Sequence, residues 1–413
     1  MTAVPPPAPD HSTLGVCFSG GGFRASFYAL GVLRYLAEAR LLDRLVAVSA
    51  VSGGSIAAAA AADRWTRFRA AGGGLDAFLA EIDAPFRAIV TGRSIRRRWM
   101  AESMLALVPF TGGRGGAYAR ALGRSLYDAK RVADLPAHPE FIFTSTDLTK
   151  GRAFRIAAAY VGSYDYGYVE PAPPSIGLGE AVAASAAFPP SMTVVPLKTG
   201  RLPFAVPAPD PLSLVDGGVY DNLGLEWFQG WESDAVRPAS ATRPGFTVVA
   251  NASGLLSHLD KRFRPIGAFT RDLAIQYEQS LSLRVRWYRR ALAANPGSGV
   301  YLAIKNDPRE SHILEPGVAE CALPSELVRP LALLRTDLDR FAPEEADLLS
   351  YHAYWTLHAR LAAYAPDLAL DEPAWQQYAG LSAAETARLR RVLELGAHRF
   401  FRGLRGRRSG GAG

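Results

Sequence analysis

Three glycine-rich corners carry the residue types that acyl transfer requires. The first reads Gly20-Gly21-Gly22, the second Ser52-Gly53-Gly54 and the third Asp216-Gly217-Gly218, and each follows an apolar run. A glycine run between a strand and a helix exposes backbone N–H groups beside a helix N-terminus, which favours negative charge. A serine at such a corner can supply the nucleophile, and an aspartate can supply the base.

The serine corner is similar to a nucleophile elbow. Ala50-Val51-Ser52-Gly53-Gly54 resembles G-x-S-x-G, a strained strand-to-helix turn that exposes the serine hydroxyl. Ala50 replaces the first glycine, and its small side chain still fits a tight corner. The neighbouring Ser49 and Ser55 lack two correctly placed glycines after them. An ordinary Ser-Gly-Gly turn has the same sequence, so the assignment of Ser52 as nucleophile depends on the other motifs.

The aspartate corner places a carboxylate on a tight, open loop. Asp216 ends the apolar run Leu212 to Val215, and the two glycines that follow keep bulky side chains away from it. A turn or helix-start aspartate gives the same local pattern. Combined with the serine corner, Asp216 is the predicted base.

The first corner also fits a different class of site. Gly20-x-Gly22-x-x-Ala25 matches the dinucleotide fingerprint G-x-G-x-x-G/A. That fingerprint expects an acidic residue at the end of the second strand. Asp43 comes before this strand, and the strand ends in Ser52 instead. The pattern therefore favours an oxyanion site over a nucleotide site.

The elements that position these corners alternate between strand and helix. Residues 14–62 read as strand, corner, helix, strand, corner and helix, with Phe27, Leu30 and Leu33 on one stripe of the first helix. This alternation predicts a parallel sheet covered on both faces. Further strands are predicted at 140–147, 152–156, 212–215, 246–251 and 300–304.

The predicted fold is a three-layer α/β sandwich with a largely parallel central sheet flanked by helices. Residues 1–13 form a disordered lead-in, 14–255 the catalytic domain and 256–413 a mainly helical C-terminal region with a basic tail. Within the catalytic domain, residues 63–135 form a helical insertion, with a flexible loop at 112–116.

Composition narrows the class of protein. The chain has 413 residues, of which 49% are hydrophobic and 21% charged, as in globular proteins. No apolar run reaches the roughly 18 residues of a membrane-spanning helix, and the start lacks a signal-peptide pattern. The net charge of +7 favours anionic surfaces, and no nucleic-acid module is found. We therefore expect a cytoplasmic protein, peripheral at a membrane, that binds no nucleic acid.

Taken in order, the three corners resemble the patatin-like phospholipase family. The resemblance covers residues 14–255. Further stretches are similar to bacterial members: Thr146-Asp147-Leu148 with Gly151, Ala184 to Pro190, and Tyr220 to Gly224.

This resemblance implies a Ser–Asp dyad without histidine, in which Asp216 removes the proton of Ser52. It also implies an oxyanion hole made by backbone N–H groups and a loop braced by Arg24. The implied reaction is hydrolysis of lipid acyl esters, in the manner of a phospholipase A, through an acyl-enzyme and without metal or organic cofactor. The residues expected at the oxyanion hole are Gly20, Gly21, Gly22 and Phe23.

Two alternatives stay open at this point. One is an α/β-hydrolase with a Ser-Asp-His triad, because several histidines follow Asp216 in the chain. The other is a lipid-binding or scaffold protein that keeps the fold without turnover. The histidines available to a triad are His258, His312, His352, His358 and His398.

Two basic segments are candidates for contact with an anionic membrane. Residues 93–108 combine an arginine cluster with Trp99, Met100 and Met104. Residues 389–408 place arginines around an apolar helical stripe. Arginine beside an apolar stripe is typical of a helix that lies on an anionic surface. A solvated helix that packs its apolar face on the core has the same pattern.

Overall fold

The computed structural model describes the chain in eight segments. Several predictions fall outside them, among them the start of the lead-in, Pro189-Pro190 and most of the basic tail. The described segments are 9–105, 113–127, 131–188, 194–200, 202–229, 237–254, 265–310 and 316–397.

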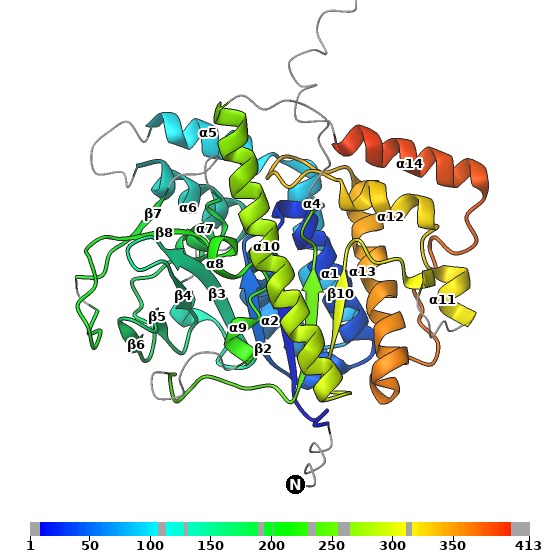
Figure 1. Ribbon diagram of the computed structural model, residues 1–413, viewed down its shortest axis with the longest axis horizontal. Helices are drawn as coiled ribbons and strands as arrows, with labels where there is room; N and C mark the ends of the chain where they lie inside the picture. Colours follow the sequence, from blue (N-terminus) through cyan, green and yellow to red (C-terminus); the bar gives the residue numbers. More distant parts are fainter. Residues whose placement is uncertain are drawn as a thin grey trace, which may run out of the picture.

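Five parallel strands form the centre of the molecule (Figure 1). Every pair of neighbours among them is parallel, in the order β10-β9-β1-β2-β3. Almost all of their residues are buried, as expected for a sheet covered on both faces. The strands are β1 Leu14–Phe18, β2 Leu45–Val51, β3 Glu140–Asp147, β9 Phe246–Asn251 and β10 Gly299–Ala303.

Five antiparallel strands extend this sheet beyond β3. β3 and β4, both predicted as strands, form a hairpin, β5 and β6 continue the sheet from β4, and β8 pairs with both β3 and β7. Their bounds are β4 Arg152–Ile156, β5 Val161–Ser163, β6 Gly167–Val169, β7 Val195–Leu197 and β8 Leu212–Asp216.

The register of β3 brings two distant corners together. Thr144 pairs with Val51, the last residue of β2, and the next residue, Ser145, pairs with Asp216 of β8. β8 therefore pairs with β3 from the point where the pairing of β2 with β3 ends. As a result, Asp216 lies beside the point where Ser52 leaves the sheet.

Helices cover both faces of the sheet, which confirms the predicted fold class. One core joins β1 and β2 to helices α1 Gly22–Glu38, α2 Gly53–Ala70 and α13 Pro343–Tyr364. The second core lies on the opposite face and includes Cys17, Ala47 and Val249 of the sheet. Helices α9 Glu226–Gln229 and α10 Pro265–Ala294 contribute side chains to this second core.

The described part of the segment from 63 to 135 is mainly helical, but one loop prediction there is wrong. Residues 113–116, expected as a flexible loop, form the first turn of a helix. A Cβ on Gly115 would lie 2.2 Å from the carbonyl oxygen of Val194, so glycine allows close packing there. The helices after α2 are α3 Leu75–Phe78, α4 Ala84–Gly92, α5 Ile95–Leu105 and α6 Gly113–Leu126, with a π-helical turn at Leu79–Asp83.

The C-terminal third is built into the same core as the rest of the chain. β10 extends the sheet, and α13 packs along α1 so closely that a Cβ on Gly31 would lie 2.0 Å from the Ser350 carbonyl oxygen. Within the described segments, no helix is long and apolar enough to cross a membrane. The remaining helices are α7 Leu178–Ala186, α8 Gly218–Asp221, α11 Pro316–Cys321, α12 Ser325–Ala332 and α14 Ala383–Ala397.

Candidate active site

Ser52 occupies a strained corner between β2 and α2. Its backbone has φ 53° and ψ −120°, a conformation that side-chain-bearing residues rarely adopt. Such strain costs about 1–3 kcal/mol and persists only where the surroundings enforce it. Here the Ser52 N–H donates to the carbonyl oxygen and the hydroxyl of Ser185, each at 3.1 Å. The corner has the geometry that a nucleophile elbow requires.

Close backbone approach explains the glycines around Ser52. A Cβ on Gly53 would lie 1.9 Å from the carbonyl oxygen of Gly22, and one on Gly54 would lie 2.6 Å from that of Phe18. A Cβ on Gly20 would lie 3.1 Å from the Cβ of Ser52. The glycine loop and the serine corner are therefore in direct contact.

Asp216 is buried at the end of β8, with only 1% of its surface exposed. Its Oδ1 accepts a hydrogen bond of 2.7 Å from the Gly218 N–H. Burial raises the pKa of this carboxyl to about 6, against the opposing effects of hydrogen bonding from the Ser52 side chain and from Gly218. Among the described residues, Oδ2 has no hydrogen-bond partner of regular geometry. The structure thus brings Ser52 and Asp216 together.

Only some of the backbone N–H groups in the glycine loop have hydrogen-bond partners. The Gly20 N–H donates to the carbonyl oxygen of Asn222 at 3.1 Å, and the Phe23 N–H to that of Asp337 at 3.5 Å. The N–H groups of Gly21 and Gly22 make no hydrogen bond within the described segments. Of the four residues expected at the oxyanion hole, these two have N–H groups available to a ligand.

Arg24 is buried and makes four hydrogen bonds to backbone carbonyl groups. Its Nε and Nη2 donate to Ala252 at 3.2 and 2.9 Å, and its Nη1 donates to Ala332 at 3.0 Å and Leu334 at 2.7 Å. Burial lowers the pKa of its guanidinium to about 10. Arg24 therefore links the glycine loop to the end of β9 and to the segment after α12.

Comparison with known proteins identifies the family. A family model described as patatin-like phospholipase matches residues 16–227, which include all three corners. This chain belongs to the patatin-like phospholipase family. No curated protein matches the sequence.

Solved structures similar to this patatin-like chain are distant. Human GIVD cytosolic phospholipase A2 has 12% identity and a TM-score of 0.48, and the alignment covers 85% of this chain and 59% of that one. Its complex with methyl gamma-linolenyl fluorophosphonate has 13% identity and a TM-score of 0.44, covering 93% and 60%. VipD from Legionella pneumophila has 12% identity and a TM-score of 0.33, covering 86% and 68%. At these values the similarities assign no residue or substrate.

The described histidines of this patatin-like chain do not complete a triad. His352 and His358 lie on α13, where His352 Nε2 is 2.9 Å from the carbonyl oxygen of Ile304 and His358 Nδ1 is 3.0 Å from the hydroxyl of Tyr35. Burial lowers the pKa of each to about 4. Both are core residues that do not contact Asp216. His258, His312 and His398 lie outside the described residues.

The nucleotide interpretation also finds no support in the structure. Asp43, the acid that it would require, pairs with Arg40 and Arg69 away from the glycine loop. The loop instead packs against the corner that carries Ser52.

Sequence reasoning missed residues that position the site. Ser185 holds the Ser52 corner and donates to the Thr144 carbonyl oxygen at 2.6 Å, while Asn222 holds Gly20. Both lie in stretches that resemble the family, so a signal was present without a role attached. Thr336 packs against Gly22, and Tyr277 lies near Asp216, but no motif surrounds either residue.

Proposed function

We propose that this protein hydrolyses acyl esters of phospholipids or related lipids with a Ser52–Asp216 dyad. The observation that carries the proposal is the register of β3, which sets the buried Asp216 beside the strained Ser52 corner. Burial raises the pKa of this carboxyl, and hydrogen bonding from the Ser52 side chain opposes the rise, as expected for a nucleophile beside its base.

In the first half-reaction, Ser52 Oγ attacks the ester carbonyl carbon while Asp216 accepts the hydroxyl proton. The C–O bond to the alcohol then breaks, and the alcohol leaves with the proton from Asp216. In the second half-reaction, water attacks the acyl-enzyme, Asp216 takes and returns a proton, and the free acid departs. A carboxyl with a pKa near 6 is suited to this exchange because it accepts and returns protons near neutral pH.

The oxyanion that forms at each step requires hydrogen-bond donors. We assign this role to the N–H groups of Gly21 and Gly22, because these have no partner within the described segments. Nucleophile elbows also use the N–H of the residue after the nucleophile, which is Gly53 here. Gly20 and Phe23 then shape the loop through their own hydrogen bonds. The four bonds of Arg24 support its assignment as the brace of this loop.

Peripheral membrane contact is a further part of the proposal, and α5 is its strongest candidate. This helix carries Arg96, Arg97 and Arg98, and its Met100 and Met104 are exposed. Exposed methionine beside arginine fits an anionic lipid surface. Co-sedimentation with anionic vesicles at low and high salt tests this, since equal binding to neutral vesicles would contradict an electrostatic contact.

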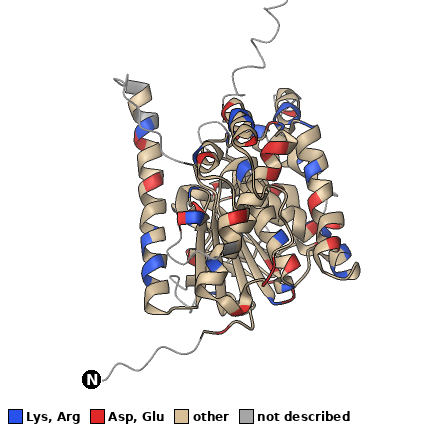
Figure 2. Ribbon diagram, turned by 90° about the vertical axis from the view of Figure 1, so that its right-hand side faces the viewer, with Lys and Arg blue, Asp and Glu red and all other residues tan. Residues whose placement is uncertain are grey.

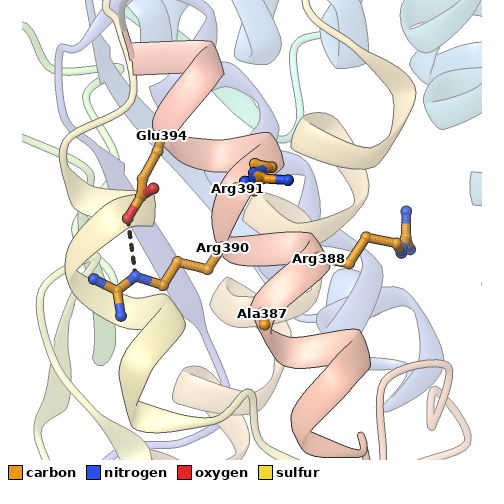
Figure 3. A pocket seen from close by; sticks show the side chains of 5 residues that line it. All are labelled: Ala387, Arg388, Arg390, Arg391 and Glu394. Carbon is orange, nitrogen blue, oxygen red and sulfur yellow. Dashed lines mark hydrogen bonds and ion pairs between the residues drawn. The ribbon is translucent and has the colours of Figure 1, made fainter.

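Helix α14 does not offer the apolar face that the sequence predicted for a membrane. Its Leu389 and Leu393 are buried against the body of the protein. Figure 3 shows Arg388, Arg390 and Arg391 projecting from the helix, with Arg390 paired to Glu394 at 2.9 Å. The described part of this segment is therefore a helix packed on the core with a charged outer face. Phe400 and Leu404 lie outside the described residues.

The decisive experiment compares wild type with Ser52→Ala and Asp216→Asn on a medium-chain p-nitrophenyl ester and on a phospholipid extract. Both variants should lose at least about 10³-fold in kcat, as happens when a nucleophile or its base is removed. Ser49→Ala is the matched control, because it removes a nearby hydroxyl that bonds Gly224 outside the dyad. Each variant is checked for folding by thermal melting.

A fluorophosphonate label adds a direct measurement. Mass spectrometry should place the label on the peptide that contains Ser52, and Asp216→Asn should label slowly. Turnover that survives in Ser52→Ala would refute the nucleophile. A folded wild type that hydrolyses neither substrate would favour a lipid-binding protein without turnover.

A further inference from the structure

Helix α10 runs across one side of the molecule and is firmly anchored in its C-terminal half (Figures 1 and 2). Its inner stripe contains Tyr277, Leu281, Arg284 and Tyr288 at helical spacing. Leu281 and Tyr288 are buried, and the Tyr288 hydroxyl donates to the Thr247 carbonyl oxygen at 2.9 Å. Arg284 lies 3.3 Å from the carboxylate of Asp221.

Towards the N-terminus of α10, the same stripe is exposed. Leu273 precedes Tyr277 by one turn on the same face, yet 45% of its surface is exposed. Phe188, just after α7, is 43% exposed and meets the ring of Tyr277 edge to face at 5.7 Å. Exposed large apolar side chains on both sides of the half-buried Tyr277 ring mark a contact surface.

This surface reaches the dyad. The Tyr277 hydroxyl and Asp216 Oδ1 each lie 3.0 Å from the point that a Cβ on Gly218 would occupy, so both groups flank Gly218. Phe188 follows Ala187, whose carbonyl oxygen accepts the Asp216 N–H at 3.1 Å. Burial and the nearby charge of Asp216 raise the pKa of Tyr277, which keeps its hydroxyl protonated at neutral pH.

We propose that Leu273, Tyr277 and Phe188 form the wall that binds the acyl chain of the substrate. The inference rests on the proposed function, because it requires an acyl ester at Ser52. Ser52 is only 8% exposed, so an acyl chain attached to it must continue onto a neighbouring apolar surface, and Tyr277 lies beside Asp216 and Gly218. Tyr277 has the right form for this place, with an apolar ring for the chain and a polar tip towards Asp216.

The wall predicts a preference for longer acyl chains. Each buried methylene adds about fourfold to kcat/KM until the chain leaves the wall. The test uses p-nitrophenyl esters of four, eight and twelve carbons, each below its micelle-forming concentration. The variants are Phe188→Ala, Leu273→Ala, Tyr277→Ala and Tyr277→Phe, with Leu283→Ala as control. Leu283 is 43% exposed on the same helix but lies off the stripe.

The three alanine variants should lose about tenfold in kcat/KM on the twelve-carbon ester and less than twofold on the four-carbon ester. Tyr277→Phe keeps the ring and should retain the chain-length preference, as should Leu283→Ala. Equal losses on short and long esters would overturn the wall and show that these residues support the dyad or the fold.

Three further outcomes also count against the proposal. An unchanged chain-length profile combined with weaker binding to phosphatidylcholine vesicles would assign the surface to membrane contact. A wild type that hydrolyses none of the esters would refute the proposed function itself. If the wild type is active and the alanine variants keep its chain-length preference, only the wall is refuted.

Discussion

The glycine corners near the N-terminus and the segment after α12 meet at one site but differ in what their sequences reveal. The corners carry the reactive groups in short motifs that are visible without a structure. The segment at 332–338 has no motif, yet Thr336 packs against Gly22 and the carbonyl groups of Ala332 and Leu334 receive Arg24. The residues proposed to react lie in local motifs, whereas the geometry of the glycine loop depends on residues far along the chain.

A buried arginine fixes the supporting segment in turn. Arg335 lies 3.3 Å from carboxylates of Asp337 and Glu345, stacks on the ring of Phe341 and donates to the Gly396 carbonyl oxygen at 3.1 Å. Its network ties the segment to α13 and α14. The support of the glycine loop is therefore a rigid part of the fold.

The largest effect is expected from breaking the contact between the two regions. Gly22→Ala would put a Cβ 1.7 Å from the Thr336 carbonyl oxygen at a backbone φ of +57°. Overpacking together with left-handed strain should cost about 4 kcal/mol of unfolding free energy. Displacement of the oxyanion donors should lower kcat by about 10²–10³-fold. Urea unfolding and ester hydrolysis measure both effects.

Gly92→Ala is the control for this change, because no atom lies within 4 Å of its Cβ position and its φ is not positive. It should alter stability by less than about 1 kcal/mol. Normal turnover in Gly22→Ala would show that the contact with Thr336 is not needed.

Arg24→Lys should have the next largest effect. The guanidinium spans three carbonyl groups, and a single ammonium cannot donate to all of them. Unsatisfied buried carbonyls should lower the unfolding free energy by about 3 kcal/mol, with kcat reduced more than KM. Arg391→Lys on the exposed face of α14 should match wild type. If Arg24→Lys keeps full stability, the brace is refuted.

Asp216 links the site to pH. Its carboxyl has a pKa of about 6 in the folded protein, against an ordinary value of 3.8, so the folded state holds the proton more tightly. Stability should therefore fall as pH rises from about 4 to about 6 and stay level above that. Asp216→Asn should be more stable than wild type by up to about 3 kcal/mol at pH 8, and the difference should vanish near pH 4.

Catalysis should show the opposite dependence, because Asp216 must be ionised to act as base. The wild-type kcat/KM should rise through a pKa of about 6. A flat pH profile over this range, or equal pH dependence of stability in Asp216→Asn, would contradict the assignment.

The smallest effect is expected on the outer face of α14. Arg390 and Glu394 form an exposed pair at 2.9 Å, so Arg390→Ala should change the unfolding free energy by less than about 0.5 kcal/mol. A loss above about 2 kcal/mol would show that this face supports the fold, as the buried Arg335 does.

The strands and corners of the central sheet could be predicted because their signals are local. Apolar runs in the sequence predicted β1, β2 and β3, and the apolar stripe at helical spacing predicted α1. The three-residue strands β5, β6 and β7 were not predicted, since such short segments carry no period. Residues 113–116 were read as a loop because glycine disfavours helix, but packing against Val194 decides their conformation.

At the site, Ser52 and Asp216 were predicted from their corners, and the structure places them side by side. The proposed oxyanion donors were less predictable. The N–H groups of Gly20 and Phe23 have partners in Asn222 and Asp337, whose positions depend on the tertiary fold. The wall around Tyr277 had no signal, because an aromatic residue on a long helix reads as core.

The bonds from Arg24 to Ala332 and Leu334 span 308 and 310 positions of sequence. During synthesis, the serine corner is made long before the segment that braces the glycine loop. Nascent and truncated chains therefore lack the braced loop. The support of the glycine loop is therefore completed only once residues 332–334 have been made.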